Sequence, residues 1–90
     1  MSDQLSHIRK RLAWRASRRG IREMDIVVGG FADARLASMS PQELISFEAM
    51  LDIPDQFLLS WLTGQEDVPH NMQTPLLLEM LAFRPDTVTP

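Results

Sequence analysis

The sequence has no cysteine and no long run of apolar residues. Without cysteine the chain cannot form a disulfide, a thiolate metal site or a cysteine nucleophile, which suits a reducing compartment. No apolar stretch approaches the roughly 20 residues that a membrane-spanning helix needs. No segment repeats, and none alternates polar and apolar residues as a strand does. We therefore expect a soluble, all-α protein that does not insert into a membrane.

Residues that could carry catalysis are few and scattered. His7 and His70 have no histidine or carboxylate at a spacing typical of a metal site. None of the serines lies in a nucleophile elbow or a plausible triad. Gly29 and Gly30 lack the lysine and the serine or threonine that end a phosphate-binding loop. We predict that the chain is not an enzyme and holds no metal.

Charge of both signs is present, but it is unevenly distributed. Residues 1–23 carry seven bases and two acids, a net charge of +5, whereas residues 24–90 carry two bases and ten acids, a net charge of −8. The seven bases are Arg9, Lys10, Arg11, Arg15, Arg18, Arg19 and Arg22. Such a basic end is either a solvated helix face or a surface for an acidic or phosphate-bearing partner.

The apolar spacing predicts a small compact bundle of four to five short helices. Apolar residues recur at steps of three and four, which defines one buried stripe for each helix. The second helix is expected at about residues 18–36 and the last at about 72–83. The methionines at helical spacing, and Trp61, are assigned to the core. The predicted core is Leu5, Ile8, Leu12, Ala16, Ile21, Met24, Val28, Phe31, Met39, Leu44, Phe47, Met50, Leu51, Phe57, Leu58, Trp61, Leu62, Leu77, Met80 and Leu81.

Several residues indicate where these helices begin, end or cross. Ser40-Pro41-Gln42-Glu43 predicts a capping box at the start of the third helix. Asp52 is expected to cap the fourth helix, with Pro54 in its first turn, and Gly64 to end it. Gly29-Gly30 lies within the second helix and indicates a close helix crossing or a kink. We expect one domain over residues 1–84 and a disordered tail over residues 85–90.

The most distinctive stretch is Arg18-Arg19-Gly20-Ile21-Arg22-Glu23-Met24-Asp25, an arginine-rich run broken by one glycine. A glycine here lets the backbone turn, or lets another backbone come close. On a continuous helix Glu23 could pair with Arg19, a contact worth only a few tenths of a kcal/mol. Trp14 lies among the arginines of the preceding helix. Its position leaves open whether it is a core residue or an interface anchor.

This stretch resembles the signature Arg-Gly-x-x-Glu of the SdhE-type succinate dehydrogenase FAD assembly factors, here Arg19-Gly20-Ile21-Arg22-Glu23. The resemblance covers about residues 8–64 in family order and at about family spacing. Its further blocks are Met24-Asp25, Phe31-Ala32-Asp33, Leu36 to Ser40, Leu51-Asp52-Ile53-Pro54-Asp55 and Trp61-Leu62-Thr63-Gly64.

The resemblance implies an assembly factor that binds the flavoprotein subunit of succinate dehydrogenase or fumarate reductase and promotes covalent FAD attachment to it. FAD would belong to the partner, with no cofactor bound stably by this chain, and direct FAD binding stays open. A Gly20→Arg or Gly20→Glu substitution is expected to abolish flavinylation with little change in stability. A bacterial-type cytoplasmic location and a monomeric free state are expected. The predicted partner-binding residues are Trp14, Arg18, Arg19, Gly20, Arg22, Glu23 and Asp25.

A nucleic-acid-binding regulatory module that uses the arginine-rich N-terminal helix is the alternative. Arginines beside an aromatic side chain could contact phosphates. The acidic body, the sequence pI of about 5.2 and the lack of a recognition helix argue against it. The resemblance therefore favours a protein partner and no nucleic acid.

Overall fold

The computed structural model describes residues 2–84 and shows five α-helices there and no strand, so the predicted all-α bundle is confirmed. Two short 3-10 helices, Leu36–Ser38 and His70–Met72, follow α2 and precede α5. The predicted disordered tail lies outside the described residues. The α-helices are α1 (Ser2–Ala16), α2 (Arg22–Arg35), α3 (Pro41–Leu51), α4 (Asp55–Leu62) and α5 (Pro75–Ala82).

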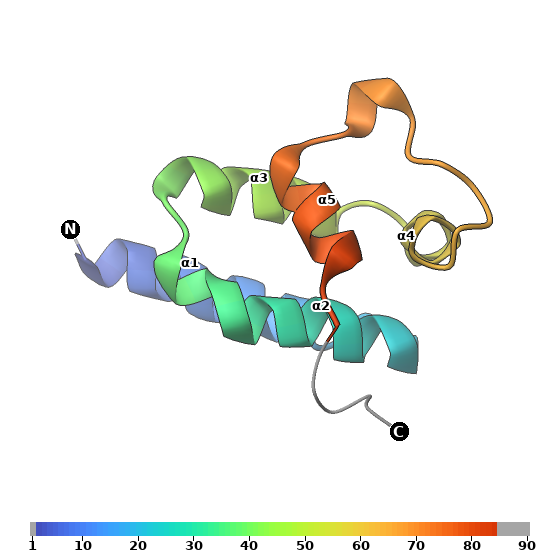
Figure 1. The fold of residues 1–90 in the computed structure, drawn as a ribbon. Coiled ribbons are helices and arrows are strands. Elements are labelled where there is room, and N and C mark those ends of the chain that lie inside the picture. The colour runs from blue at the N-terminus through green and yellow to red at the C-terminus, as the bar shows by residue number, and fades with distance from the viewer. Residues whose placement is uncertain (1, 85–90) are drawn as a thin grey trace.

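The first two helices form an antiparallel hairpin, and the three later helices pack over it (Figure 1). α1 contacts α2 and α3, and α5 contacts α2, α3 and α4. Side-chain hydrogen bonds from Arg19 reach the carbonyl oxygens of Leu51 and Ile53. The loop between α1 and α2, residues 17–21, therefore lies against the turn between α3 and α4, residues 52–54.

The core takes one apolar stripe from each helix, as the sequence predicts. Phe31 and Phe47 are fully buried, with ring centroids 6.1 Å apart. Phe83 packs edge-on against Phe31 at 5.6 Å. Burial of the methionines confirms that they fill the core. These methionines are Met24, Met39, Met50 and Met80.

Phe57 is the main exception among the predicted core residues. Its side chain is 44% exposed, whereas Trp61 on the same helix is buried as predicted. The two rings stack with centroids 6.3 Å apart. Because α4 has only eight residues and buries the side of Leu58 and Trp61, the ring of Phe57 lies at the surface.

Two helices begin later than the sequence predicts because of backbone conformation. α2 begins at Arg22 because Gly20 adopts a φ of +96°, which an α-helix does not contain. α4 begins at Asp55, with Pro54 at its N-cap and with Asp52 at the C-cap of α3. The prediction that Asp52 caps α4 is wrong, because a residue that precedes a proline, here Ile53, disfavours the helical region.

The last helix also begins later than predicted, at Pro75. The Thr74 hydroxyl accepts a hydrogen bond from the N–H of Leu77 at 3.1 Å, so Thr74 caps α5. Pro75 occupies the first position, where its missing donor costs nothing. Thr74-Pro75 therefore marks the start of α5 in the sequence. The prediction placed the start earlier because it relied on apolar periodicity alone.

Other predicted boundaries are confirmed. The N–H of Glu43 donates to Ser40 Oγ at 3.1 Å, and the N–H of Ser40 donates to Glu43 Oε1 at 3.0 Å, which completes the capping box. Gly64 has a φ of +79° just after α4. A Cβ added at Gly29 would lie 3.3 Å from Cα and Cβ of Ser17, so this glycine marks the close crossing of α2 with the end of α1.

Candidate partner-binding site

Arg19 ties the loop at residues 17–21 to the turn at residues 52–54. Its side chain is only 8% exposed, and its Nε–H donates to Asp55 Oδ1 at 2.7 Å. Its terminal nitrogens donate to the carbonyl oxygens of Leu51, at 2.6 Å, and Ile53, at 2.7 Å. Carbonyl groups at the end of a helix have no partner within the helix, so Arg19 supplies one. We call Arg19, Asp55 and these two carbonyl groups the Arg19 clamp.

Asp25 fixes the backbone of the same loop. Its Oδ1 accepts a hydrogen bond from the backbone N–H of Arg19 at 2.5 Å. Asp25 lies in the first turn of α2, where the helix dipole favours a negative charge. The pair between Arg19 and Glu23 does not form among the described residues, because α2 starts after Arg19 and the Arg19 side chain turns to Asp55.

Gly20 lies between these two anchors and faces outward. Its φ of +96° is a conformation that L side chains rarely adopt. No atom lies within 4 Å of the position that a Cβ would take. The turn therefore requires glycine for its backbone conformation, while the space outside it is open to a partner.

Four exposed side chains accompany Gly20 in or next to this loop. Trp14 is 59% exposed, and the guanidinium carbon of Arg18 lies 4.7 Å from its ring centroid, a cation–π contact. Within residues 2–84, Arg22 and Glu23 form no side-chain hydrogen bond or ion pair. We call these five exposed residues the Gly20 face: Trp14, Arg18, Gly20, Arg22 and Glu23.

Two further arginines of α1 form ion pairs within the chain, at its surface. Arg11 pairs with Glu48 at 3.1 Å, and Arg15 pairs with Asp52 at 2.9 Å. With the Arg19 clamp they form a row in which bases four residues apart meet acids of α3, of its C-cap and of α4. The sequence analysis missed this row because it interpreted the bases as one exposed surface. The matching spacing of the acids was the available signal.

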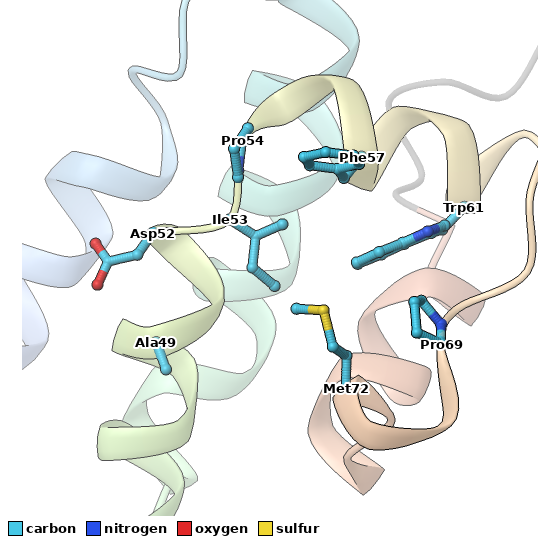
Figure 2. Close-up of a pocket in the computed structure, with 8 residues that line it drawn as sticks. All are labelled: Ala49, Asp52, Ile53, Pro54, Phe57, Trp61, Pro69 and Met72. Atoms are coloured by element: carbon cyan, nitrogen blue, oxygen red, sulfur yellow. The ribbon is translucent and has the colours of Figure 1, made fainter.

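The turn at residues 52–54 separates two hollows. A polar hollow of about 400 Å³ lies on the side of Trp14 and Arg18. An apolar pocket of about 380 Å³ lies on the other side, between α3, α4 and the 3-10 helix at His70–Met72 (Figure 2). The apolar pocket is lined by Ala49, Asp52, Ile53, Pro54, Phe57, Trp61, Pro69 and Met72.

Three features that mark other kinds of site are absent from the described part of the chain. Over residues 2–84 no three histidine or carboxylate side chains gather so that they could hold a metal ion. Every buried side-chain nitrogen and oxygen in that range has a hydrogen-bond partner. No helix in that range is long and apolar enough to cross a membrane.

Comparison with known proteins identifies the family. Residues 10–84 match the family described as flavinator of succinate dehydrogenase. The chain is 40% identical over 79 residues to the FAD assembly factor SdhE of Acetobacter pasteurianus, which covers 88% of this chain and 72% of that protein. No solved structure matches it.

Mitochondrial proteins are also similar to this chain. It is 33% identical over 76 residues to succinate dehydrogenase assembly factor 2 of Debaryomyces hansenii, covering 81% of this chain and 54% of that protein. It is 26% identical over 74 residues to the protein of that name from Dictyostelium discoideum, covering 82% and 52%. The chain thus spans about half the length of these two relatives. Because the family match extends over most of its residues, the chain belongs to the family of succinate dehydrogenase flavinators.

Proposed function

We propose that this chain binds the flavoprotein subunit of succinate dehydrogenase, or of fumarate reductase, and promotes covalent attachment of FAD to that subunit. Family membership supports the role. The structural observation that carries it is the Gly20 face, a set of exposed side chains on a loop that the Arg19 clamp and Asp25 fix from behind. A surface that is already ordered loses little conformational entropy when it binds.

The clamp and the Gly20 face have different tasks in this proposal. Arg19 and Asp25 position the loop and do not contact the partner. Arg18 and Arg22 offer guanidinium groups, which suit carboxylates and phosphates, and the exposed indole of Trp14 offers an apolar anchor. The signature motif thus combines one inward-facing residue, Arg19, with outward-facing ones.

The chain acts in this proposal as an assembly factor and not as the catalyst. The flavin supplies the chemistry of its own attachment, and the chain holds the partner in a suitable arrangement. FAD belongs to the partner. In the polar hollow Arg15 and Arg19 already bond Asp52 and Asp55, so that hollow is poorly suited to a pyrophosphate.

The nucleic-acid alternative has less support from the structure than from the sequence. Contacts to a phosphate backbone need available arginine or lysine side chains. Most of those in the N-terminal region already form hydrogen bonds or ion pairs within the chain. Retention of the chain on duplex DNA at about 150 mM salt, lost steeply at higher salt, would nevertheless favour that alternative. The engaged bases are Arg9, Arg11, Arg15 and Arg19.

Reconstitution with purified components tests the proposal. The apo flavoprotein subunit is incubated with FAD, with and without this chain, and covalent flavin is measured as ultraviolet fluorescence of the denatured subunit in a gel. We expect the chain to raise the rate of covalent incorporation, whereas an unrelated acidic protein of similar size should not. Equal rates in all three reactions would contradict the proposal.

We also propose that the free chain is a monomer that works in the cytoplasm, as the sequence analysis predicts. Sedimentation equilibrium of the purified chain tests the first statement, and cell fractionation tests the second. A stable dimer at micromolar concentration would contradict the monomeric state and leave the proposed function standing.

A further inference from the structure

We propose that the apolar pocket between α3, α4 and His70–Met72 is a second docking point, and that it accepts an apolar side chain from a basic segment of the flavoprotein subunit. The inference rests on the proposed function and extends it to a surface outside the Gly20 face. Four observations carry it: the exposed apolar walls, the scarcity of polar groups, the surrounding charge and the shared turn.

The walls of the pocket are large apolar side chains, two of which are exposed to water. Phe57 and Trp61 of α4 face a common space with Met72 of the 3-10 helix (Figure 2). Ile53 points into the same space from the turn before α4. Phe57 is 44% exposed and Met72 is 37% exposed. Large apolar side chains that cluster at the surface mark interaction sites more often than single ones do.

The lining favours a protein side chain over a small polar ligand. Among residues 2–84, Asp52 is the one charged residue that lines the pocket. Its carboxylate points away from the pocket and bonds Arg15 at 2.9 Å (Figure 2). The indole nitrogen of Trp61 is the other polar side-chain atom there. Cofactor sites hold their ligands with several convergent polar groups, which this pocket does not offer. An apolar anchor from a protein partner needs none.

The charge around the pocket selects for a basic partner segment. From residue 36 to residue 83 the sequence has seven acids and no lysine or arginine. Five of the acids bond arginines of α1, the following loop and α2. The other two, Glu66 and Asp67, are exposed in the loop that leads to Pro69, which is one wall of the pocket. A segment with lysine or arginine beside an apolar residue would complement this surface.

The pocket is continuous with the surface beside the Gly20 face. Ile53 and Pro54 line both the apolar pocket and the polar hollow. A partner that covers Trp14 and Arg18 therefore reaches the pocket by crossing one short turn. Arg19 holds that turn in place through the carbonyl oxygen of Ile53. One partner can thus engage both docking points without a rearrangement of this chain.

Binding of the full chain to the apo flavoprotein subunit, measured by isothermal titration calorimetry, tests the inference. Phe57→Asp should weaken binding at least about tenfold, because it places a charge in an apolar contact. Leu78→Asp is the matched control, since Leu78 is 46% exposed on α5 and undergoes the same chemical change. Thermal unfolding of each variant establishes that it is folded. Equal weakening by Leu78→Asp would overturn the inference.

A second variant keeps the test decisive if Phe57→Asp does not fold. Ala49 is an exposed residue of α3 that lines the pocket, so Ala49→Trp should fill the pocket and weaken binding without loss of core packing. Wild-type affinity for Ala49→Trp, with wild-type flavin attachment intact, would overturn the inference and leave the proposed function standing. If the unmodified chain neither binds the subunit nor promotes flavin attachment, the proposed function itself fails.

The charge of the partner segment has its own test. The double substitution Glu66→Lys and Asp67→Lys should weaken binding several-fold at low salt, and the difference should shrink as salt is added, because exposed charges are screened. Unchanged binding at low salt would overturn the assignment of a basic segment. Tighter binding would point to an acidic one and overturn it as well.

Discussion

The guanidinium of Arg19 uses each of its three nitrogens inside the molecule. One contacts a carboxylate and two contact carbonyl oxygens, with distances of 2.6 to 2.7 Å. A planar group with donors in fixed directions suits this arrangement, whereas the ammonium of lysine is a compact charge on a flexible stem. The Arg19 side chain therefore orders the loop from inside. In the proposed function it is a positioning residue, and the Gly20 face makes the contact.

Replacing Arg19 should destabilise the fold. Arg19→Ala leaves the Asp55 carboxylate and two carbonyl groups without their donor, and loss of one partner of a buried pair costs about 3 kcal/mol. Urea unfolding measures the change. Arg11→Ala is the control, because its pair with Glu48 is exposed and should cost about 0–1 kcal/mol. Equal losses for the two variants would contradict the clamp.

Substitutions at Gly20 can distinguish the effect of backbone strain on stability from the effect of side-chain bulk on partner binding. The φ of +96° at Gly20 should make Gly20→Ala cost about 1–2 kcal/mol. The same strain applies to Gly20→Arg and Gly20→Glu, for which the sequence led us to expect little change in stability. Because no atom lies within 4 Å of the missing Cβ, Gly20→Arg should unfold at about the same urea concentration as Gly20→Ala. The rate of flavin attachment with Gly20→Arg should nevertheless be much lower than with Gly20→Ala. Equal rates for the two variants would show that bulk at Gly20 meets no partner.

At the scale of elements, the crossing of α2 with the end of α1 depends on Gly29. A Cβ at this position would lie 3.3 Å from Cα and Cβ of Ser17, so Gly29→Val should cost about 1–3 kcal/mol through overpacking. The double variant Ser17→Gly with Gly29→Ala should be more stable than the sum of its single variants predicts, because it removes the facing Cβ. Chemical unfolding of the wild type, Ser17→Gly, Gly29→Ala and the double variant gives the coupling free energy between the two positions. Additive values would contradict a close crossing.

Arg35 joins three helices at the other end of the bundle. It extends from the end of α2 to Glu79 of α5, at 2.6 Å, and to Glu43 of α3, at 3.0 Å. The pKa of Arg35 is raised by Glu79 and, to a smaller degree, by Glu43, while burial opposes them. The pKa of Glu43 lies below its ordinary value of 4.5 because the carboxylate accepts hydrogen bonds from the Ser40 N–H and from Arg35.

This depressed pKa predicts how stability depends on pH. A carboxyl whose folded-state pKa lies below its unfolded value stabilises the fold above that unfolded value, and the contribution is lost as pH falls through the folded pKa. The free energy of unfolding should therefore decrease as the pH falls below 4.5, and Glu43→Gln should lessen the decrease. Urea unfolding of both proteins over this range measures it. Identical pH profiles would contradict the contribution of Glu43.

The sequence predicted the helices better than their boundaries. Stripes such as Leu44, Phe47 and Leu51 identify a buried face because helical geometry repeats every 3.6 residues. The start of α2 depends on the φ of Gly20, which spacing alone does not give. Phe57 was assigned to the core because apolar periodicity does not show how many faces a short helix can bury.

At the scale of the whole molecule, folding pairs much of the basic N-terminal end with the acidic body. The partners of Arg11 and Arg15 lie 37 residues away in the sequence, and Asp55 lies 36 residues from Arg19. Sequence reasoning could therefore identify the motif residues but not which of them would turn inward. Of the N-terminal bases, Lys10, Arg18 and Arg22 form no ion pair within residues 2–84. In the proposed function, recognition would therefore depend on a local face more than on the overall field.

The rate of covalent flavin attachment by two charge-reversal variants tests this account most directly. Arg22 is exposed in the first turn of α2, where an acid is favourable, so Arg22→Glu should leave the fold intact or slightly more stable. Lys10→Glu makes the same change on exposed α1 surface outside the Gly20 face. We predict attachment at least about tenfold slower with Arg22→Glu, consistent with loss of a charged contact, and wild-type attachment with Lys10→Glu. Equal rates for the two variants, fast or slow, would contradict the Gly20 face as the contact surface.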